Sequence, residues 1–111
     1  GSWGIPIYPG TNLVMKTSSD KSETVGDNIP AVAEARIYTT SDKRTDVVAF
    51  YENKMPANGW TEMLRTDTGE VNMGSSVRQY EKNDGRESAS VQCSDIKDGG
   101  TMINMMWKYP K

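Results

Sequence analysis

One segment of the chain, residues 42–55, carries the hydrophobic period of an α-helix. Its apolar residues recur at i, i+3, i+4 and i+8 and so form one stripe: Val47, Phe50, Tyr51 and Met55. Ser41 or Asp42 can accept hydrogen bonds from the first-turn amides, and Pro56 is expected to end the helix. A single amphipathic helix must bury its stripe against another element, so the remaining segments decide the fold.

Most of those segments alternate with period two, which is the pattern of half-buried strands. In residues 31–40, one face would hold Ala33, Ala35, Ile37 and Thr39, and the other Glu34, Arg36 and Tyr38. Further strands are expected at residues 13–16, 60–65, 71–82, 88–94 and 102–109. The facing of 71–82 stays open, because its two halves agree only if Gly74 forms a bulge.

The predicted order is therefore β-β-α-β-β-β-β in a single domain spanning residues 3–111. We expect an α+β fold of two layers, with one main helix packed on an antiparallel sheet. Residues 5–9 contain two prolines and are expected to be irregular or at a sheet edge. Residues 17–30 are polar and glycine-containing, and are expected to form a mobile loop that is a candidate for ligand contact.

Composition removes several classes of function. The chain has no histidine, one cysteine and a net charge of -2. A Ser-His-Asp triad, a His-ligated zinc, a proximal-His haem and a cysteine-cluster metal site are thereby excluded. The nearly neutral charge argues against nucleic acid and against electrostatic membrane binding. No glycine-rich phosphate loop or paired nucleophile and base is visible, so we expect a domain without enzymatic activity and without a cofactor.

The start of the chain bears on location. Gly1-Ser2 has the form of a scar left by tag cleavage, and we expect that a signal, lipid-anchor or transmembrane segment precedes the domain in the full-length protein. Within the chain, the longest apolar run is Met105-Met106-Trp107, which is far shorter than a membrane span.

Four short stretches carry a resemblance: Ile5-Pro-Ile-Tyr-Pro-Gly10, Tyr38-Thr-Thr-Ser-Asp42, Val47-Val-Ala-Phe-Tyr51 and Met55-Pro-Ala-Asn-Gly-Trp60. Together they resemble small domains of predicted bacterial and archaeal lipoproteins and membrane-anchored envelope proteins. The resemblance implies an extracytoplasmic, anchored, non-catalytic domain at the cell surface or in the periplasm. It carries over no active-site residues. Each stretch also has a structural role, since capping, packing and turn residues are what a helix and its ends require.

Exposed aromatic side chains are the best indication of binding. Five aromatic residues exceed what one 14-residue helix can cover: Trp3, Tyr8, Tyr38, Tyr80 and Tyr109. Because tyrosine and tryptophan are enriched at interfaces, these residues are a candidate partner surface. The expected partner is another envelope protein or a surface ligand, which makes the domain a binding or assembly module.

A second hypothesis concerns sulfur. Met102, Met105 and Met106 lie close in sequence, and Cys93 lies on the preceding predicted strand. Thioether and thiolate groups are soft ligands that suit Cu(I). Strand alternation, however, sends Met105 to the face opposite Met102 and Met106, which favours core packing over a metal site.

Acidic residues gather near the predicted hairpin ends: Glu70, Glu81, Asp84, Glu87, Asp95 and Asp98. A calcium loop would need denser oxygen ligands, and Lys97 interrupts the last pair. We therefore expect these carboxylates to be solvated turn residues.

Overall fold

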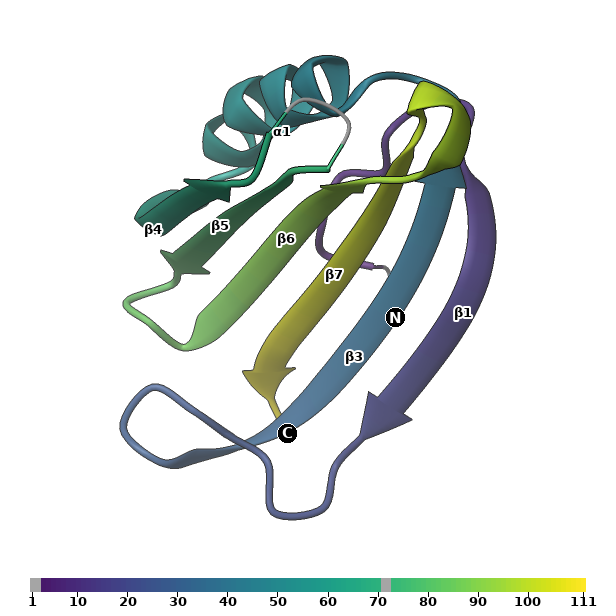
Figure 1. Ribbon diagram of the computed structural model, residues 1–111. Coiled ribbons are helices and arrows are strands. Elements are labelled where there is room, and N and C mark those ends of the chain that lie inside the picture. Colours follow the sequence, from purple (N-terminus) through teal and green to yellow (C-terminus); the bar gives the residue numbers. More distant parts are fainter. Residues whose placement is uncertain (1–2, 71–72) are drawn as a thin grey trace.

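The computed structural model of the protein describes residues 3–70 and 73–111 (Figure 1). It has one α-helix and a seven-stranded antiparallel sheet, so the α+β class is confirmed. The elements in chain order are β1 (Asn12–Ser19), β2 (Thr24–Val25), β3 (Ile29–Thr40), α1 (Arg44–Ala57), β4 (Thr61–Thr68), β5 (Ser75–Lys82), β6 (Glu87–Asp95), a short 3-10 helix (Lys97–Gly99) and β7 (Thr101–Pro110). The two-residue strand β2 is the departure from the predicted order.

The sheet is open, and its strand order is β1-β3-β7-β6-β5-β4, with β2 paired to β3. The strands β4 to β7 form a meander in which each pairs with the next, and β7 also pairs with β3, which joins the meander to β3 and β1. That last pairing is continuous from Ala31 opposite Pro110 to Thr40 opposite Thr101. The C-terminal strand is therefore central, while β1 and β4 are the two edges (Figure 1).

The helix buries three residues of the predicted stripe, Val47, Tyr51 and Met55, in one core cluster with residues of the sheet. Phe50, the fourth, is only partly buried, and its ring packs edge-on against Tyr8, with centroids 5.2 Å apart. The prediction that Pro56 ends the helix is wrong. Pro56 lies inside the last turn of α1, and Asn58 is the C-terminal cap. Because proline has no amide donor and its ring crowds the carbonyl four residues earlier, the helix extends only one residue beyond it, to Ala57.

Residues 17–30 do not form a single loop, contrary to the prediction. The strand β1 continues to Ser19, where it pairs with Ala33 of β3. Strand β2 follows, with Val25 buried, and its neighbour Gly26 approaches the turn at Gly85. The polar side chains of 17–19 form a strand because β3 supplies the backbone partners, which local sequence does not reveal. Residues 5–9 are irregular, as predicted.

Pairing across the sheet defines its two faces. The helix side carries the row Tyr38, Ile103, Cys93 and Ser76. The opposite side, here called the open face, carries the row Ala35, Met106, Ser90, Gln79 and Leu64.

The strand β5 has the facing that the sequence left open: Ser76, Arg78 and Tyr80 are buried on the helix side. Gly74 precedes this strand and forms no bulge in it, and Val71 lies outside the described residues. The irregularity is in β4 instead, between Glu62 and Leu64.

Candidate functional site

Two of the five aromatic residues predicted to form a partner surface are in the core. Tyr38 is 7% exposed and Tyr80 is 2% exposed, so neither can contact a partner of the folded chain. The correction has a simple cause: both side chains lie on the face that the helix covers. Burial raises the pKa of Tyr80 to about 12, so its hydroxyl stays protonated at neutral pH.

The other three aromatic residues do not form one surface either. Trp3 and Tyr109 both pack on Trp107, with ring centroids 5.7 and 4.2 Å away. The Arg36 guanidinium lies 4.3 Å from the Trp3 ring centroid, and the Tyr109 hydroxyl donates to Glu34 at 2.7 Å. These contacts use the aromatic rings to hold residues near Trp3 against β3 and β7.

Tyr8 lies apart from that cluster. Its hydroxyl donates to Asp42 at 2.6 Å, which joins the N-terminal segment to the start of α1. The hydrogen bond to Asp42 raises the pKa of Tyr8 to about 12, with smaller contributions from burial and nearby carboxylates. The Tyr8 ring is thus a structural contact rather than a free platform.

The sheet separates the four sulfur-bearing residues of the alternative metal site. Cys93 and Met105 are buried on the helix side, where the Tyr51 hydroxyl contacts the Met105 sulfur at 3.6 Å. Met102 and Met106 lie on the open face, opposite Ser94 and Ser90. Burial raises the pKa of the Cys93 thiol to about 12, which disfavours the thiolate that binds metal. The four sulfurs therefore do not converge on one point.

A buried arginine organises the charges between α1 and the β4 edge. Arg78 is 4% exposed and donates to Asp67 at 3.0 and 3.2 Å and to Glu52 of α1 at 3.1 Å. The hydrogen bond from Arg78 lowers the pKa of Asp67. Beside them, Arg65 donates twice to Glu62 at 2.9 Å, and this bond lowers the pKa of Glu62. These ion pairs tie β4, β5 and the helix together.

A second ion pair corrects the expectation for Asp95. This residue is not a solvated turn carboxylate: Arg44 donates to it at 3.0 Å from the first turn of α1, and the Gly74 amide donates at 2.7 Å. Arg44 also donates to Ser76 at 2.7 Å. The sequence offered no signal for this contact, because its partners are 21 and 51 residues from Asp95.

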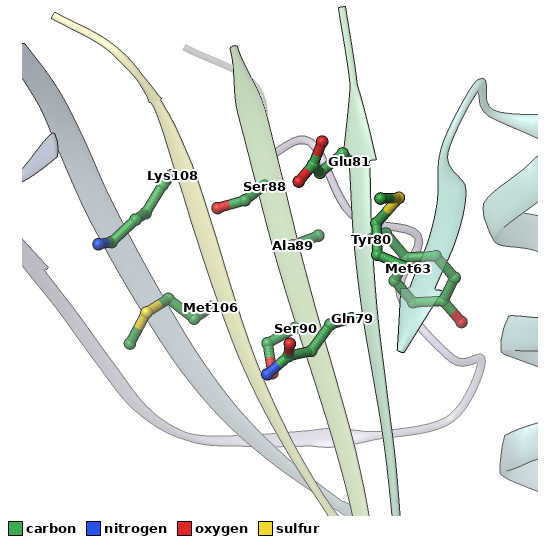
Figure 2. Close-up of a pocket in the computed structure, with 9 residues that line it drawn as sticks. All are labelled: Met63, Gln79, Tyr80, Glu81, Ser88, Ala89, Ser90, Met106 and Lys108. Atoms are coloured by element: carbon green, nitrogen blue, oxygen red, sulfur yellow. The ribbon is translucent and has the colours of Figure 1, made fainter. Parts of the chain in front are cut away.

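A shallow groove of about 280 Å³ follows β6 on the open face. Figure 2 shows Ser88 and Ser90 along its floor, with Lys108 and Met106 on one side. On the other side are Gln79, Glu81 and Met63, while the Tyr80 ring points away from the groove (Figure 2). The Lys108 ammonium lies 3.4 Å from Glu23 and donates to the Thr24 carbonyl, which holds β2 at the end of the groove.

The largest groups of exposed apolar side chains lie on the two edge strands of the sheet. All eight residues of β1 and all eight of β4 are exposed. Large apolar side chains are half exposed or more at both edges: Leu13, Val14 and Met15 on β1, and Met63 and Leu64 on β4. Each strand also has a register shift there, between Leu13 and Met15 and between Glu62 and Leu64. Consecutive apolar residues in a strand, unlike alternating ones, were the sequence signal for this surface.

No described helix is long and apolar enough to cross a membrane. Within residues 3–70 and 73–111, no three side chains of His, Cys, Asp or Glu are grouped so that they could hold a metal ion.

Comparison with known proteins identifies a family to which the chain is similar. None of the curated proteins and none of the solved structures matches the chain. A family model described as START domain-like matches residues 14–100, which runs from the β1 edge to the turn before β7. That span covers most of the sheet and the whole helix, and the chain therefore belongs to the START domain-like family.

Proposed function

We propose that this domain is a non-catalytic binding or assembly module that engages a protein partner through the edges and the open face of its sheet. The observation that carries the proposal is the concentration of exposed apolar side chains on β1 and β4. Edge strands present unpaired backbone donors and acceptors, and natural sheets usually protect long edges with charge or cover. Here β1 exposes three consecutive apolar residues with Lys16 as the one charged residue of the strand.

The groove on the open face supports the same proposal. Met63 belongs both to the β4 edge and to the groove, so the groove opens onto that edge. The serine floor offers hydroxyl groups to a partner's polar atoms. A non-catalytic role also accords with the ion pairs of Arg78 and Arg44, which commit nearby carboxylates to holding elements together.

The location of the module is part of the proposal. The resemblance of four stretches between residues 5 and 60 to domains of lipoproteins and envelope proteins supports an extracytoplasmic position, on an anchor outside this chain. The partner would be another envelope protein or a surface ligand. Fractionation of cells that express the tagged full-length gene product tests this directly. We expect the protein in the membrane fraction and accessible to protease added outside the cytoplasm; a cytosolic, protected protein would contradict the placement.

Site-specific photo-crosslinking tests the binding surface. A photoreactive phenylalanine analogue at Val14 lies on the β1 edge, whereas the same analogue at Asn53 lies on the exposed side of α1. In intact cells, we expect a discrete adduct from position 14 and none from position 53. A third variant carries the analogue at Leu64, on the β4 edge. Equal labelling from positions 14 and 53, or no adduct from either position 14 or position 64, would argue against a docking role for the edges.

A further inference from the structure

We propose that the partner is a second copy of this chain, and that the β1 edge of one copy pairs with the β4 edge of the next in a head-to-tail contact. The inference rests on the proposed function, which it makes specific. Both edges are eight residues long and exposed throughout, and each carries adjacent apolar residues at a register shift.

Strand direction permits this contact. All neighbouring strands of the sheet are antiparallel, and five steps along the order β1-β3-β7-β6-β5-β4 leave β1 and β4 antiparallel to each other. A β4 edge placed beside the β1 edge of another copy therefore continues the antiparallel pattern, with both helices on the same side. All eight β4 residues are exposed, so α1 does not cover that edge.

One register matches the side chains of the two edges. When Val14 lies opposite Leu64 of the neighbouring copy, Met15 lies opposite Met63, and both cross-strand pairs join two apolar side chains. The next pair is Lys16 with Glu62, which have opposite charges. Thr17 with Thr61 follows, and these β-branched hydroxyl residues suit a cross-strand pair.

The same register keeps the sheet faces consistent. Lys16 pairs with Arg36 of its own sheet, and Glu62 pairs with Tyr80, so both lie on the helix side. Met15, opposite Ile37, lies on the open face, and Met63 lines the groove of that face. A register shifted by one residue would set each side chain against the opposite face of the neighbouring sheet.

Charge favours this contact over self-pairing of equal edges. The strand β1 contains no Asp or Glu, so a β1–β1 contact offers Lys16 no carboxylate. Among the described residues Lys16 has no ion-pair partner within its own chain. Glu62 pairs with Arg65 at 2.9 Å and with Arg78 at 3.9 Å, and its side chain is 32% exposed, which leaves it accessible to a further cation. A heterologous contact of this kind builds a ring or an open chain rather than a closed dimer.

Complementary edge variants test the proposal by sedimentation velocity. Val14→Lys blocks the β1 edge and Leu64→Lys blocks the β4 edge, each by placing a charge in the apolar pair. We expect the wild-type domain to exceed twice its 12.3 kDa mass as concentration rises, and each variant alone to associate at least about tenfold more weakly. An equimolar mixture of the two variants retains one intact β1 edge and one intact β4 edge, and should form a heterodimer that grows no further.

Matched controls separate charge from position. Gln92→Lys adds the same charge on the central strand β6 and should leave association unchanged. Lys16→Glu and Glu62→Lys should each weaken association, and the double variant should restore it because the pair is reversed. Circular dichroism of every variant confirms that the fold is retained.

Other outcomes overturn the proposal. A wild-type domain that stays monomeric, or a Leu64→Lys variant that self-associates as strongly as wild type, excludes the β1–β4 contact. If the domain is monomeric but position 14 still crosslinks to a single different protein in cells, self-assembly is wrong and the binding function stands. If neither association nor crosslinking is found, both fail.

Discussion

At the scale of single residues, the buried guanidinium of Arg78 determines how the helix meets the sheet. The Arg78 side chain is 5% exposed, whereas its partners Asp67 and Glu52 are 53% and 39% exposed, and Glu52 also pairs with Arg65 at 3.3 Å. Solvent screens carboxylates this exposed, so the ion pairs add little stability and Arg78 mainly holds β5 against α1. Its role is thus to specify which part of β5 lies beneath the helix.

This contact predicts an acid dependence of stability. The hydrogen bond from Arg78 lowers the pKa of Asp67 in the folded state. The ionised Asp67 therefore stabilises the fold at pH values above the pKa that this residue has in the unfolded chain, and the stabilisation is lost as the pH falls through the folded-state pKa. We expect the free energy of unfolding of wild type to exceed that of Asp67→Asn at pH 7, and the difference to shrink between about pH 5 and pH 3. Urea titrations at each pH measure it; a difference that is constant with pH would contradict the assignment.

At the scale of elements, the N-terminal segment closes the core although it has no regular structure. Ile5 is 2% exposed and belongs to the same cluster as the helix stripe. Trp60, which follows α1, donates its indole N–H to the Gly4 carbonyl at 3.3 Å. Gly4 itself lies so close to the Trp107 ring that a Cβ would overlap it. The segment is therefore packed as firmly as a strand.

Two isoleucines two residues apart test this packing. Ile5→Ala removes a buried side chain, and we expect a loss of about 2–5 kcal/mol in the free energy of unfolding. Ile7→Ala is the matched control, because Ile7 is 37% exposed, and its loss should be under about 1 kcal/mol. Chemical denaturation of both variants provides the comparison. If the loss in the free energy of unfolding for Ile5→Ala were as small as that for Ile7→Ala, residues 3–8 would lie on the core without being part of it.

The same elements show what sequence could and could not provide. The helix was predictable because its period is local, and alternation alone put Met105 and Met106 on opposite faces. The extension of β1 through Ser19 was not, because its partner Ala33 is remote in sequence. The prediction of an aromatic surface was wrong for a related reason. Residue type identifies Tyr38 and Tyr80 as large side chains, but only the tertiary fold decides which face of the sheet the helix covers.

At the scale of the whole molecule, stability should fall from the centre of the sheet to its edges. Strands β6 and β7 lie at the centre of the strand order and each contributes three buried residues, whereas the edge strands β1 and β4 contribute none. Hydrogen exchange of the dilute, monomeric domain should therefore be slowest in β6 and β7 and fastest in β1 and β4. The outward amides of both edges should exchange within the first time points. Comparable protection of β1 and β7 under those conditions would contradict the open sheet.

The central place of the last strand also governs how the chain can be made. Until residues 101–110 leave the ribosome, no strand pairing joins β1 and β3 to the meander of β4 to β6, since β7 is the strand that pairs with both β3 and β6. A nascent or truncated chain thus exposes two additional unpaired strands, β3 and β6, together with the core-facing residues that β7 would cover. The sheet therefore cannot be completed before β7 is available, and loss of β7 leaves two halves of a sheet rather than a smaller domain.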